Sequence, residues 1–362
     1  FYSYMNSLND SLALKNICVI RLSALGDCCH ALAIAQHLRN QLPEANITWI
    51  IGKTEYQLVD QITDIQFIVV DKSKLFKSLI KVFIELRNIT FDVVLNMHAS
   101  MSANLVSLMV KSKRKIGYDK ARARDLQKLF CHESIPSKSN QHVVDGMLEF
   151  SKFIGIDCDK PKWNLPICKK AEDTMRSHIN LDQVTCVISP CSSQRYGDQY
   201  NRSWPIENYI EVIHHLIKIN AQIIITGGNT EIEKKYSEEI SKTFPNQITN
   251  LIGQSSIKEL AAIICLSDFV ISPDSGPAHI ASVTNTPVIG LYAMSNPLRS
   301  GPYNSQEWVI NAYEKSLSAF MSTNAENVKW GQKIKHPEAM HLILPKLVFF
   351  FFKQQTAYEI HS

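Results

Sequence analysis

Short apolar runs alternate with helix-length amphipathic segments from residue 17 onward. The runs are continuous and rich in β-branched residues, which is typical of strands covered on both faces of a parallel sheet. The intervening helical periodicity predicts a βαβα order and therefore a doubly wound α/β fold. The predicted strands cover residues 17–22, 47–51, 67–70 and 91–97 in the first half, and residues 184–189, 221–226, 250–253, 269–272 and 288–291 in the second.

The alternation weakens between residues 111 and 140 and resumes after a polar, proline-containing connection over residues 157–170. A chain of 362 residues suits two domains of about 150 residues each. We therefore predict two Rossmann-like domains that face each other across a cleft, one over residues 1–165 and the other over residues 166–335. We expect the C-terminal segment, residues 336–362, to pack back on the N-terminal domain.

The composition excludes several classes of protein. Hydrophobic residues make up 45% of the chain and charged residues 20%, which is globular rather than disordered. The net charge of +4 gives no global argument for nucleic-acid binding. The nine cysteines are odd in number, scattered and free of CxxC pairs, so they predict neither a zinc site nor a disulfide scaffold. Reduced cysteines favour a cytoplasmic location.

Membrane-spanning segments are not predicted, because no apolar stretch reaches the roughly 18 residues that a span requires. A signal peptide is not predicted, because the residues near residue 1 do not show a basic segment followed by an apolar core. The run LVFFFF at residues 347–352 leaves two interpretations open. It packs onto the body of the protein, or it contacts a membrane.

Ligands in doubly wound sheets bind beyond the carboxyl ends of the strands. The first such turn contains Arg21, Gly26 and Asp27, and Asp27 falls at the start of the next predicted helix. An acid there stabilises the helix dipole, and it is equally suited to act as a general base. No GxGxxG or P-loop motif accompanies the turn.

Three turns of the second half combine polar and charged residues. Residues 189–205 include Ser192, Ser193 and Arg202 before a helix start, a pattern that suits a pyrophosphate or a solvated loop. A Gly-Gly turn precedes Glu231 and permits close approach of a ligand. The third turn contains a carboxylate, a hydroxyl, a glycine and a histidine where a helix begins, at Asp274, Ser275, Gly276 and His279. Asp274 also suits a plain N-cap role and His279 a packing role.

Residues 111–124 contain seven basic residues and one acid. Such a run forms a solvated face or binds an anionic ligand. The basic residues are Lys111, Lys113, Arg114, Lys115, Lys120, Arg122 and Arg124.

These turns and their order resemble glycosyltransferase family 9, the ADP-heptose:lipopolysaccharide heptosyltransferases. The resemblance runs in register over residues 17–345, and the Asp-Ser-Gly-x-x-His block is its most specific part. The matching stretches are RLSALGDCCHALAIAQHLR (21–39), NRSWPIENYIEVI (201–213), ITGGNTEIE (225–233) and ISPDSGPAHIASVTNTPVIGLYAMSNPLRSGPY (271–303).

The resemblance implies an inverting, metal-independent transferase of the GT-B fold. Asp27 matches the family's general base, and Arg202 lies where the family has a lysine that contacts the diphosphate. Asp274, Ser275, Gly276 and His279 match its donor-binding turn. Ser192 and Ser193 match its hydroxyl pair, although residues 194–200 look like an insertion there. We expect Glu231 to bind the donor as well.

The family's acceptor is an anionic, Kdo-containing lipid, which implies acceptor-binding roles for Lys113, Arg114, Arg122 and Arg124. The basic run over residues 111–124 and LVFFFF together predict peripheral contact with anionic lipid on the cytoplasmic face of the inner membrane. Three alternatives stay open: a different nucleotide-sugar or acceptor, including a protein; a nucleotide-sugar epimerase; and a catalytically silent nucleotide-sugar binding protein. A lone Asp27 argues against the epimerase, and the presence of both Asp27 and Asp274 argues against the silent binder.

Overall fold

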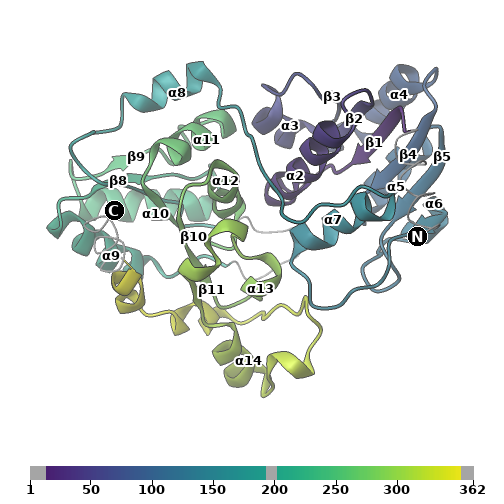
Figure 1. Ribbon diagram of the computed structural model, residues 1–362. Coiled ribbons are helices and arrows are strands. Elements are labelled where there is room, and N and C mark those ends of the chain that lie inside the picture. Colours follow the sequence, from purple (N-terminus) through teal and green to yellow (C-terminus); the bar gives the residue numbers. More distant parts are fainter. Residues whose placement is uncertain (1–13, 193–201, 352–362) are drawn as a thin grey trace. The chain divides into compact units, whose positions relative to one another are not determined.

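A computed structural model describes residues 14–192 and 202–351 of the chain (Figure 1). Its internal contacts divide the chain between Pro166 and Ile167 into two compact units. We call them the first and second unit. The division lies next to the boundary expected between residues 165 and 166.

The first unit is built on a parallel sheet with the strand order β3-β2-β1-β4-β5-β6. The chain leaves β1 in one direction and returns to the other side of it with β4, so the order reverses between these two strands. Such a switch point is where doubly wound sheets bind ligands. The strands are β1 (Asn16–Ile20), β2 (Asn46–Gly52), β3 (Gln66–Val70), β4 (Phe91–Asn96), β5 (Ser112–Gly117) and β6 (Glu133–Ser134).

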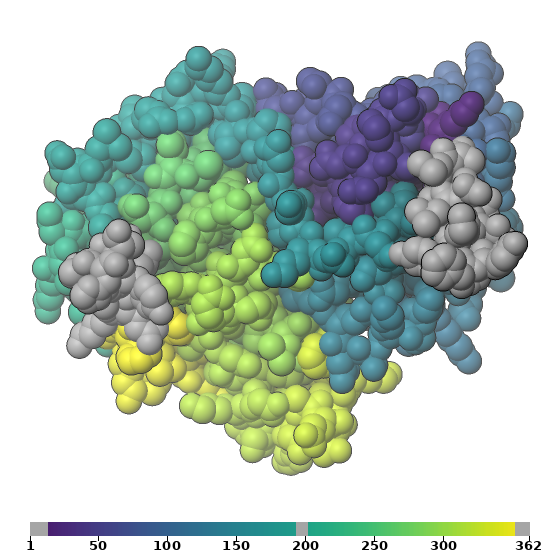
Figure 2. Space-filling model, in the orientation of Figure 1, coloured from purple at the N-terminus to yellow at the C-terminus, as the bar shows by residue number. Residues whose placement is uncertain are grey.

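Helices cover the first sheet. Although they are far apart in the sequence, α2 and α7 lie side by side (Figures 1 and 2). The side chain of Trp163 ties the segment after α7 to α2, because its Nε1 donates to the carbonyl of Cys29 at 2.8 Å. The helices are α2 (Leu25–Gln41), α3 (Lys53–Val59), η1 (Lys72–Lys74), α4 (Leu75–Leu86), α5 (Met101–Leu108), α6 (Gln127–Phe130) and α7 (Val143–Phe153).

The second unit repeats this architecture with the strand order β12-β11-β10-β7-β8-β9. Its switch point lies between β7 and β10. The strands are β7 (Thr185–Ile188), β8 (Gln222–Ile225), β9 (Thr249–Asn250), β10 (Phe269–Pro273), β11 (Val288–Tyr292) and β12 (Val309–Asn311). The helices are α8 (Lys169–Arg176), α9 (Ile206–Lys218), α10 (Glu231–Thr243), α11 (Ile257–Leu266), α12 (Gly276–Thr284), α13 (Pro297–Ser300), η2 (Tyr303–Trp308), α14 (Tyr313–Met321), η3 (Ala325–Asn327) and η4 (Pro337–Leu342).

The predicted doubly wound α/β architecture is confirmed in both units. The strands β1, β4, β7 and β10 are almost entirely buried, as expected for parallel sheets covered on both faces. The pattern of apolar runs missed β5, β6 and β12. The edge strands β6 and β12 are only two and three residues long, and β5 has the polar sequence SKRKIG.

The C-terminal segment differs from the expectation that it packs on the N-terminal domain. Its described part, up to residue 351, joins the core of the second unit, where Val348 is buried. The ring of Phe349 stacks on His215 at 4.3 Å between centroids. The indole Nε1 of Trp204 donates to the carbonyl of Ile343 at 3.0 Å. Of the described part of LVFFFF, Val348, Phe349 and Phe351 pack onto the second unit, whereas Leu347 and Phe350 are exposed.

Within the described ranges, no helix is both long and apolar enough to cross a bilayer. All nine cysteines lie in those ranges and are free thiols. Eight of them are buried or partly buried, and Cys265 is exposed.

Candidate active site

Asp27 lies just beyond the carboxyl end of β1, at the switch point of the first sheet. It is the third residue of α2, and its carboxylate accepts a hydrogen bond from the backbone N–H of Ala24 at 3.4 Å. The guanidinium of Arg21 forms an ion pair with the same carboxylate. The Asp27 side chain keeps 28% of its surface exposed, against 10% for Arg21. The carboxylate is therefore anchored by the protein and still accessible to a ligand.

Two neighbouring strands hold Arg21 and His98 close to this turn. Arg21 donates from Nη1 to the carbonyl of Met97, the residue after β4, at 2.6 Å. His98 accepts a hydrogen bond on Nδ1 from the N–H of Leu22 at 3.2 Å. Burial and the positive charges of Arg21 and Lys72 lower the pKa of His98 to about 3. The imidazole is therefore neutral at physiological pH.

Two further charged side chains belong to the same edge of the first sheet. Lys72 donates from Nζ to Ser23 Oγ, in the turn that leads to Asp27. Burial raises the pKa of Glu55, in the first turn of α3. Burial also lowers the pKa of Lys72, against the opposing charge of Glu55. The sequence analysis missed Lys72, Glu55 and His98, and their position shortly after β3, β2 and β4 is the signal that points to them.

Asp274 lies beyond the carboxyl end of β10, at the switch point of the second sheet. Arg202 donates from Nε to the backbone carbonyl of Asp274 at 2.9 Å and lies 3.3 Å from its Oδ2. Ser295 Oγ donates to the same Oδ2 at 2.7 Å. His279 Nε2 lies 3.9 Å from Oδ1. Three side chains from separate segments thus converge on one carboxylate.

Asp274 is an ionised group inside the protein. Burial raises its pKa, but the nearby imidazole of His279, the charge of Arg202 and the hydrogen bond from Ser295 outweigh burial and hold the pKa well below its usual range. The N-cap role that the sequence leaves open for Asp274 does not apply, because Ser275 is the N-cap of α12. Asp274 instead positions the guanidinium of Arg202.

The segments before and after residues 193–201 are joined by hydrogen bonds. The Ser192 Oγ accepts from the backbone N–H of Arg202 at 2.7 Å. The Ser192 N–H donates to Ser203 Oγ at 3.0 Å. The structure therefore brings the predicted Ser192 and Arg202 together. The predicted Ser193 lies outside the described residues.

Ser275 and Gly276 follow Asp274 at the start of α12. Ser275 is buried, and its Oγ lies 2.8 Å from the Oγ of Ser272 on β10. Gly276 is the first residue of α12. The backbone N–H groups of this helix start therefore lie beside the Asp274–Arg202 pair, as an anion site requires.

The position of Glu231 does not favour the donor-binding role expected for it. Its side chain is 91% exposed and pairs with Lys234 at 2.8 Å. Another acid, Glu233, accepts hydrogen bonds from the N–H groups of Gly228 at 2.6 Å and Thr230 at 2.9 Å. The structure thus places Glu233, rather than the predicted Glu231, in the glycine turn.

Lys113 and Arg114, two of the predicted acceptor residues, lie on β5 toward the amino ends of the strands. Lys113 Nζ pairs with Asp92 at 2.7 Å. Arg114 makes two hydrogen bonds with the carboxylate of Glu133, at 2.8 and 2.6 Å. Asp27 lies beyond the opposite, carboxyl ends of the strands, so the structure does not bring Lys113 or Arg114 to it.

Arg122 and Arg124 follow β5 on the carboxyl side of the sheet. Arg122 forms an ion pair with Asp119, donates to the carbonyl of Pro136 at 3.0 Å and lies 5.6 Å from the ring centre of Tyr118. Arg124 is exposed, and its side chain makes no hydrogen bond or ion pair within the described part of the chain. Arg124 is thus the predicted acceptor residue with the most accessible charge.

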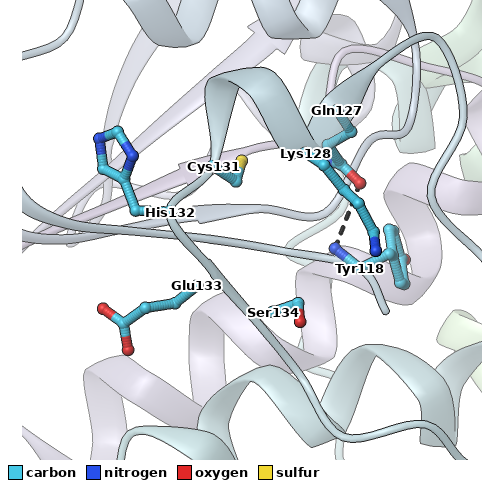
Figure 3. Close-up of a pocket in the computed structure, with 7 residues that line it drawn as sticks. All are labelled: Tyr118, Gln127, Lys128, Cys131, His132, Glu133 and Ser134. Carbon is cyan, nitrogen blue, oxygen red and sulfur yellow. Dashed lines mark hydrogen bonds between the residues drawn. The ribbon is translucent and has the colours of Figure 1, made fainter. Parts of the chain in front are cut away.

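A small pocket of about 230 Å³ lies beside β6, beyond the end of β5 (Figure 3). Figure 3 shows Gln127 accepting a hydrogen bond from the N–H of Tyr118, at 3.2 Å. The volume is below the roughly 300 Å³ at which ligand pockets begin, and we assign it no ligand. It is lined by Tyr118, Gln127, Lys128, Cys131, His132, Glu133 and Ser134.

Metal ligation has no visible basis in the described segments. There, no three side chains of His, Cys, Asp or Glu are grouped so that they could hold a metal ion. The charged side chains described at the two switch points include Arg21, Asp27, Lys72 and Glu55 in the first unit and Arg202 and Asp274 in the second.

Comparisons with known proteins agree with this architecture. The model of "Glycosyltransferase family 9 (heptosyltransferase)" matches residues 79–329. The chain is 38% identical over 328 residues to the lipopolysaccharide core heptosyltransferase OpsX of Haemophilus influenzae, covering 91% of this chain and 93% of the relative. It is 24% identical to lipopolysaccharide heptosyltransferase 3 of Escherichia coli K12, covering 80% of this chain and 86% of that one.

Solved structures show the same fold. A family 9 glycosyltransferase from Veillonella parvula superposes with a TM-score of 0.75 at 19% identity, covering 94% of this chain and 96% of that one. The E. coli heptosyltransferase WaaC with ADP superposes with a TM-score of 0.70 at 17% identity, covering 94% and 99%. The architecture is therefore GT-B, as predicted. With the match of the family model over most of its length, the chain belongs to glycosyltransferase family 9 and is a glycosyltransferase.

Proposed function

We propose that this glycosyltransferase moves heptose from ADP-heptose to the Kdo region of the lipopolysaccharide inner core, with inversion at the anomeric carbon. The relative with 38% identity is a lipopolysaccharide core heptosyltransferase, and it is matched along almost its whole length. The single observation that carries the mechanism is the partly exposed carboxylate of Asp27, held by Arg21 at the switch point of the first sheet.

Asp27 acts in this proposal as the general base. An acceptor hydroxyl transfers its proton to the Asp27 carboxylate while its oxygen forms a bond to the anomeric carbon of the heptose. The bond from that carbon to the diphosphate oxygen breaks, and ADP leaves. General-base assistance of this kind contributes about 10²–10⁴-fold to the rate.

Arg202 stabilises the departing diphosphate. Its Nε is engaged with Asp274, and its remaining N–H groups are of the type that binds phosphate oxygens in pairs. Ser192, Ser275 and the N–H groups at the start of α12 complete the donor site. Charge stabilisation of the leaving group comes from these groups, and we propose that transfer needs no metal ion.

The acceptor is an anionic saccharide on a lipid anchor. Arg124, with Arg122 beside it, lies on the carboxyl side of the first sheet, the side on which Asp27 is found. The exposed Arg124 suits a carboxylate or phosphate of the acceptor, whereas Arg122 already pairs with Asp119. Acceptor roles for Lys113 and Arg114 stay predictions. Their side chains already pair with Asp92 and Glu133, which argues against these roles.

The decisive experiment is the variant Asp27→Asn, assayed with ADP-heptose and Kdo₂-lipid A in the presence of EDTA. Asparagine keeps the size of the side chain but accepts no proton. We expect kcat to fall by about 10²–10⁴-fold, with little change in the KM for ADP-heptose. Product formation is followed by mass spectrometry.

The matched control is Asp64→Asn, an exposed acid of the first unit that lies outside the turn. It should transfer heptose at the wild-type rate. Near-wild-type turnover of Asp27→Asn would remove the general-base assignment. If the wild-type enzyme transfers sugar from a different nucleotide-sugar but not from ADP-heptose, the proposed donor is wrong.

A further inference from the structure

Helix α4 carries a stripe of large apolar side chains that the fold leaves uncovered. Phe76, Ile80, Phe83 and Ile84 are 76%, 46%, 47% and 52% exposed. Their spacing of four, seven and eight residues from Phe76 places all four on one side of the helix. We call these four residues the α4 stripe.

The α4 stripe is not the side of the helix that packs on the sheet. Ser78, Val82 and Leu86 form that side and are buried, and α4 packs against β3 and α5. The helix is therefore apolar on two sides, of which the protein's own core uses one. A contiguous group of exposed large apolar side chains marks an interaction surface.

Basic residues line one long edge and both ends of the α4 stripe. By the 3.6-residue repeat, Lys77 and Lys81 lie along one edge of the stripe. Lys74 directly precedes the helix, and Arg87 directly follows it. Lys81 also pairs with Glu85 at 3.7 Å, and Glu85 is the single acid between residues 72 and 87, against five basic residues. The stripe thus has a net positive charge along one edge and at its two ends.

We infer that α4 docks the protein on the anionic surface of a lipid bilayer. An apolar helix side bordered by lysine and arginine is the pattern of helices that lie in the membrane interface, where the apolar side chains enter the acyl boundary and the cations meet anionic headgroups. The charge complementarity favours such a surface over a second copy of this chain, because two copies would bring their lysines together.

This docking rests on the proposed function, because a lipid-linked acceptor lies on the same surface. Lys72, three residues before α4, donates to Ser23 in the turn of Asp27. The helix that meets the bilayer therefore begins beside the turn that carries the base. Docking at this place raises the local concentration of the acceptor at Asp27.

The test measures co-sedimentation of the full chain with vesicles, without donor or acceptor. Wild type should bind vesicles of phosphatidylcholine and phosphatidylglycerol at least tenfold more tightly than vesicles of phosphatidylcholine alone. The double variant Phe76→Ser/Phe83→Ser should lose at least tenfold in binding to the anionic vesicles. Lys77→Glu/Lys81→Glu should abolish the preference for phosphatidylglycerol.

Matched controls come from the second unit. Leu181 is 86% exposed and Lys235 is 68% exposed, and Leu181→Ser and Lys235→Glu should bind vesicles as wild type does. All substituted side chains are exposed, and thermal melts verify that each variant is folded. Wild-type binding by the α4 variants would overturn the inference. The inference would also be overturned if Phe76→Ser/Phe83→Ser converted a dimer into a monomer while vesicle binding stayed unchanged.

Transfer assays separate this inference from the proposed function. Phe76→Ser/Phe83→Ser should transfer heptose normally to a deacylated, water-soluble Kdo acceptor and at least tenfold more slowly to the same acceptor embedded in vesicles. If wild type binds vesicles through α4 but transfers heptose to neither acceptor, the proposed function fails and the docking surface stands. If it transfers heptose without binding vesicles, the docking surface fails alone.

Discussion

Arg21 and His98 support the Asp27 turn in opposite charge states. Arg21 is a cation that pairs with the carboxylate and with the carbonyl of Met97. His98 lies beside Arg21 as a neutral ring, whose Nδ1 accepts from the backbone of Leu22. A protonated His98 would lose that acceptor and add a second positive charge next to Arg21. Neutrality of His98 is therefore part of the local structure.

His98 should make the folded protein sensitive to mild acid. Its folded pKa of about 3 lies below the ordinary value of about 6.5, so only the unfolded chain binds the proton between these values. The stabilisation is complete above about pH 6.5 and is lost as the pH falls toward 3. When the pH is lowered from about 7 to about 5, the free energy of unfolding of wild type should therefore fall by about 2 kcal/mol more than that of His98→Gln.

Urea denaturation at the two pH values measures this difference. His132→Gln replaces an exposed histidine of the same unit and should keep the wild-type pH dependence. Equal pH dependence of His98→Gln and wild type would show that folding does not lower the pKa of His98.

Single elements show where sequence patterns succeed. Continuous apolar runs identified the central strands, because both of their faces are buried. The strand β5, with the sequence SKRKIG, has no such run. Two of its three cations, Lys113 and Arg114, pair with Asp92 and Glu133 on neighbouring strands. That compensation depends on the register of the sheet and leaves no local signal. Asp27 and Asp274 were identifiable because each lies within a contiguous motif. His98 and Lys72 lie near Asp27 only because of the order of the strands they follow, so no contiguous motif identifies them.

The start of α11 offers a test at this scale. Ser256 accepts from the N–H of Glu259 at 3.3 Å, and Glu259 accepts from the N–H of Ser256 at 2.7 Å, a reciprocal capping box. Ser256→Ala should lower the free energy of unfolding by about 1 kcal/mol, measured by urea denaturation. The adjacent Ser255→Ala serves as control and should change it by less than about 0.5 kcal/mol. Equal effects of the two would show that the cap is not formed.

The whole molecule consists of two sheets of the same strand order, each with a charged cluster at its switch point. The proposed division into a base-bearing and a donor-binding half is compatible with this repeat. Asp27 belongs to the first unit, and Arg202 and Asp274 to the second. Donor binding and base catalysis should therefore be separable by substitution.

Nucleotide stabilisation tests that separation. ADP at about 100 times its Kd should stabilise the protein by about 2.7 kcal/mol, and UDP at the same concentration should stabilise it less. Asp27→Asn should keep the ADP-dependent rise in Tm, and Arg202→Gln should lose most of it. Differential scanning fluorimetry measures both. Equal shifts with ADP and UDP would contradict the proposed donor, and an unchanged shift in Arg202→Gln would remove that residue from the donor site.

The hydrogen bond from Arg202 to Ser192 has a consequence for evolution. It joins the two residues that flank residues 193–201, so both ends of that stretch are anchored on the second unit whatever lies between them. Doubling the length of a loop with fixed ends costs only about 0.6 kcal/mol. Insertions and deletions can therefore accumulate at this point while Ser192 and Arg202 keep their places. A change of length between Ser192 and Arg202 therefore need not disturb the pair that Arg202 forms with Asp274.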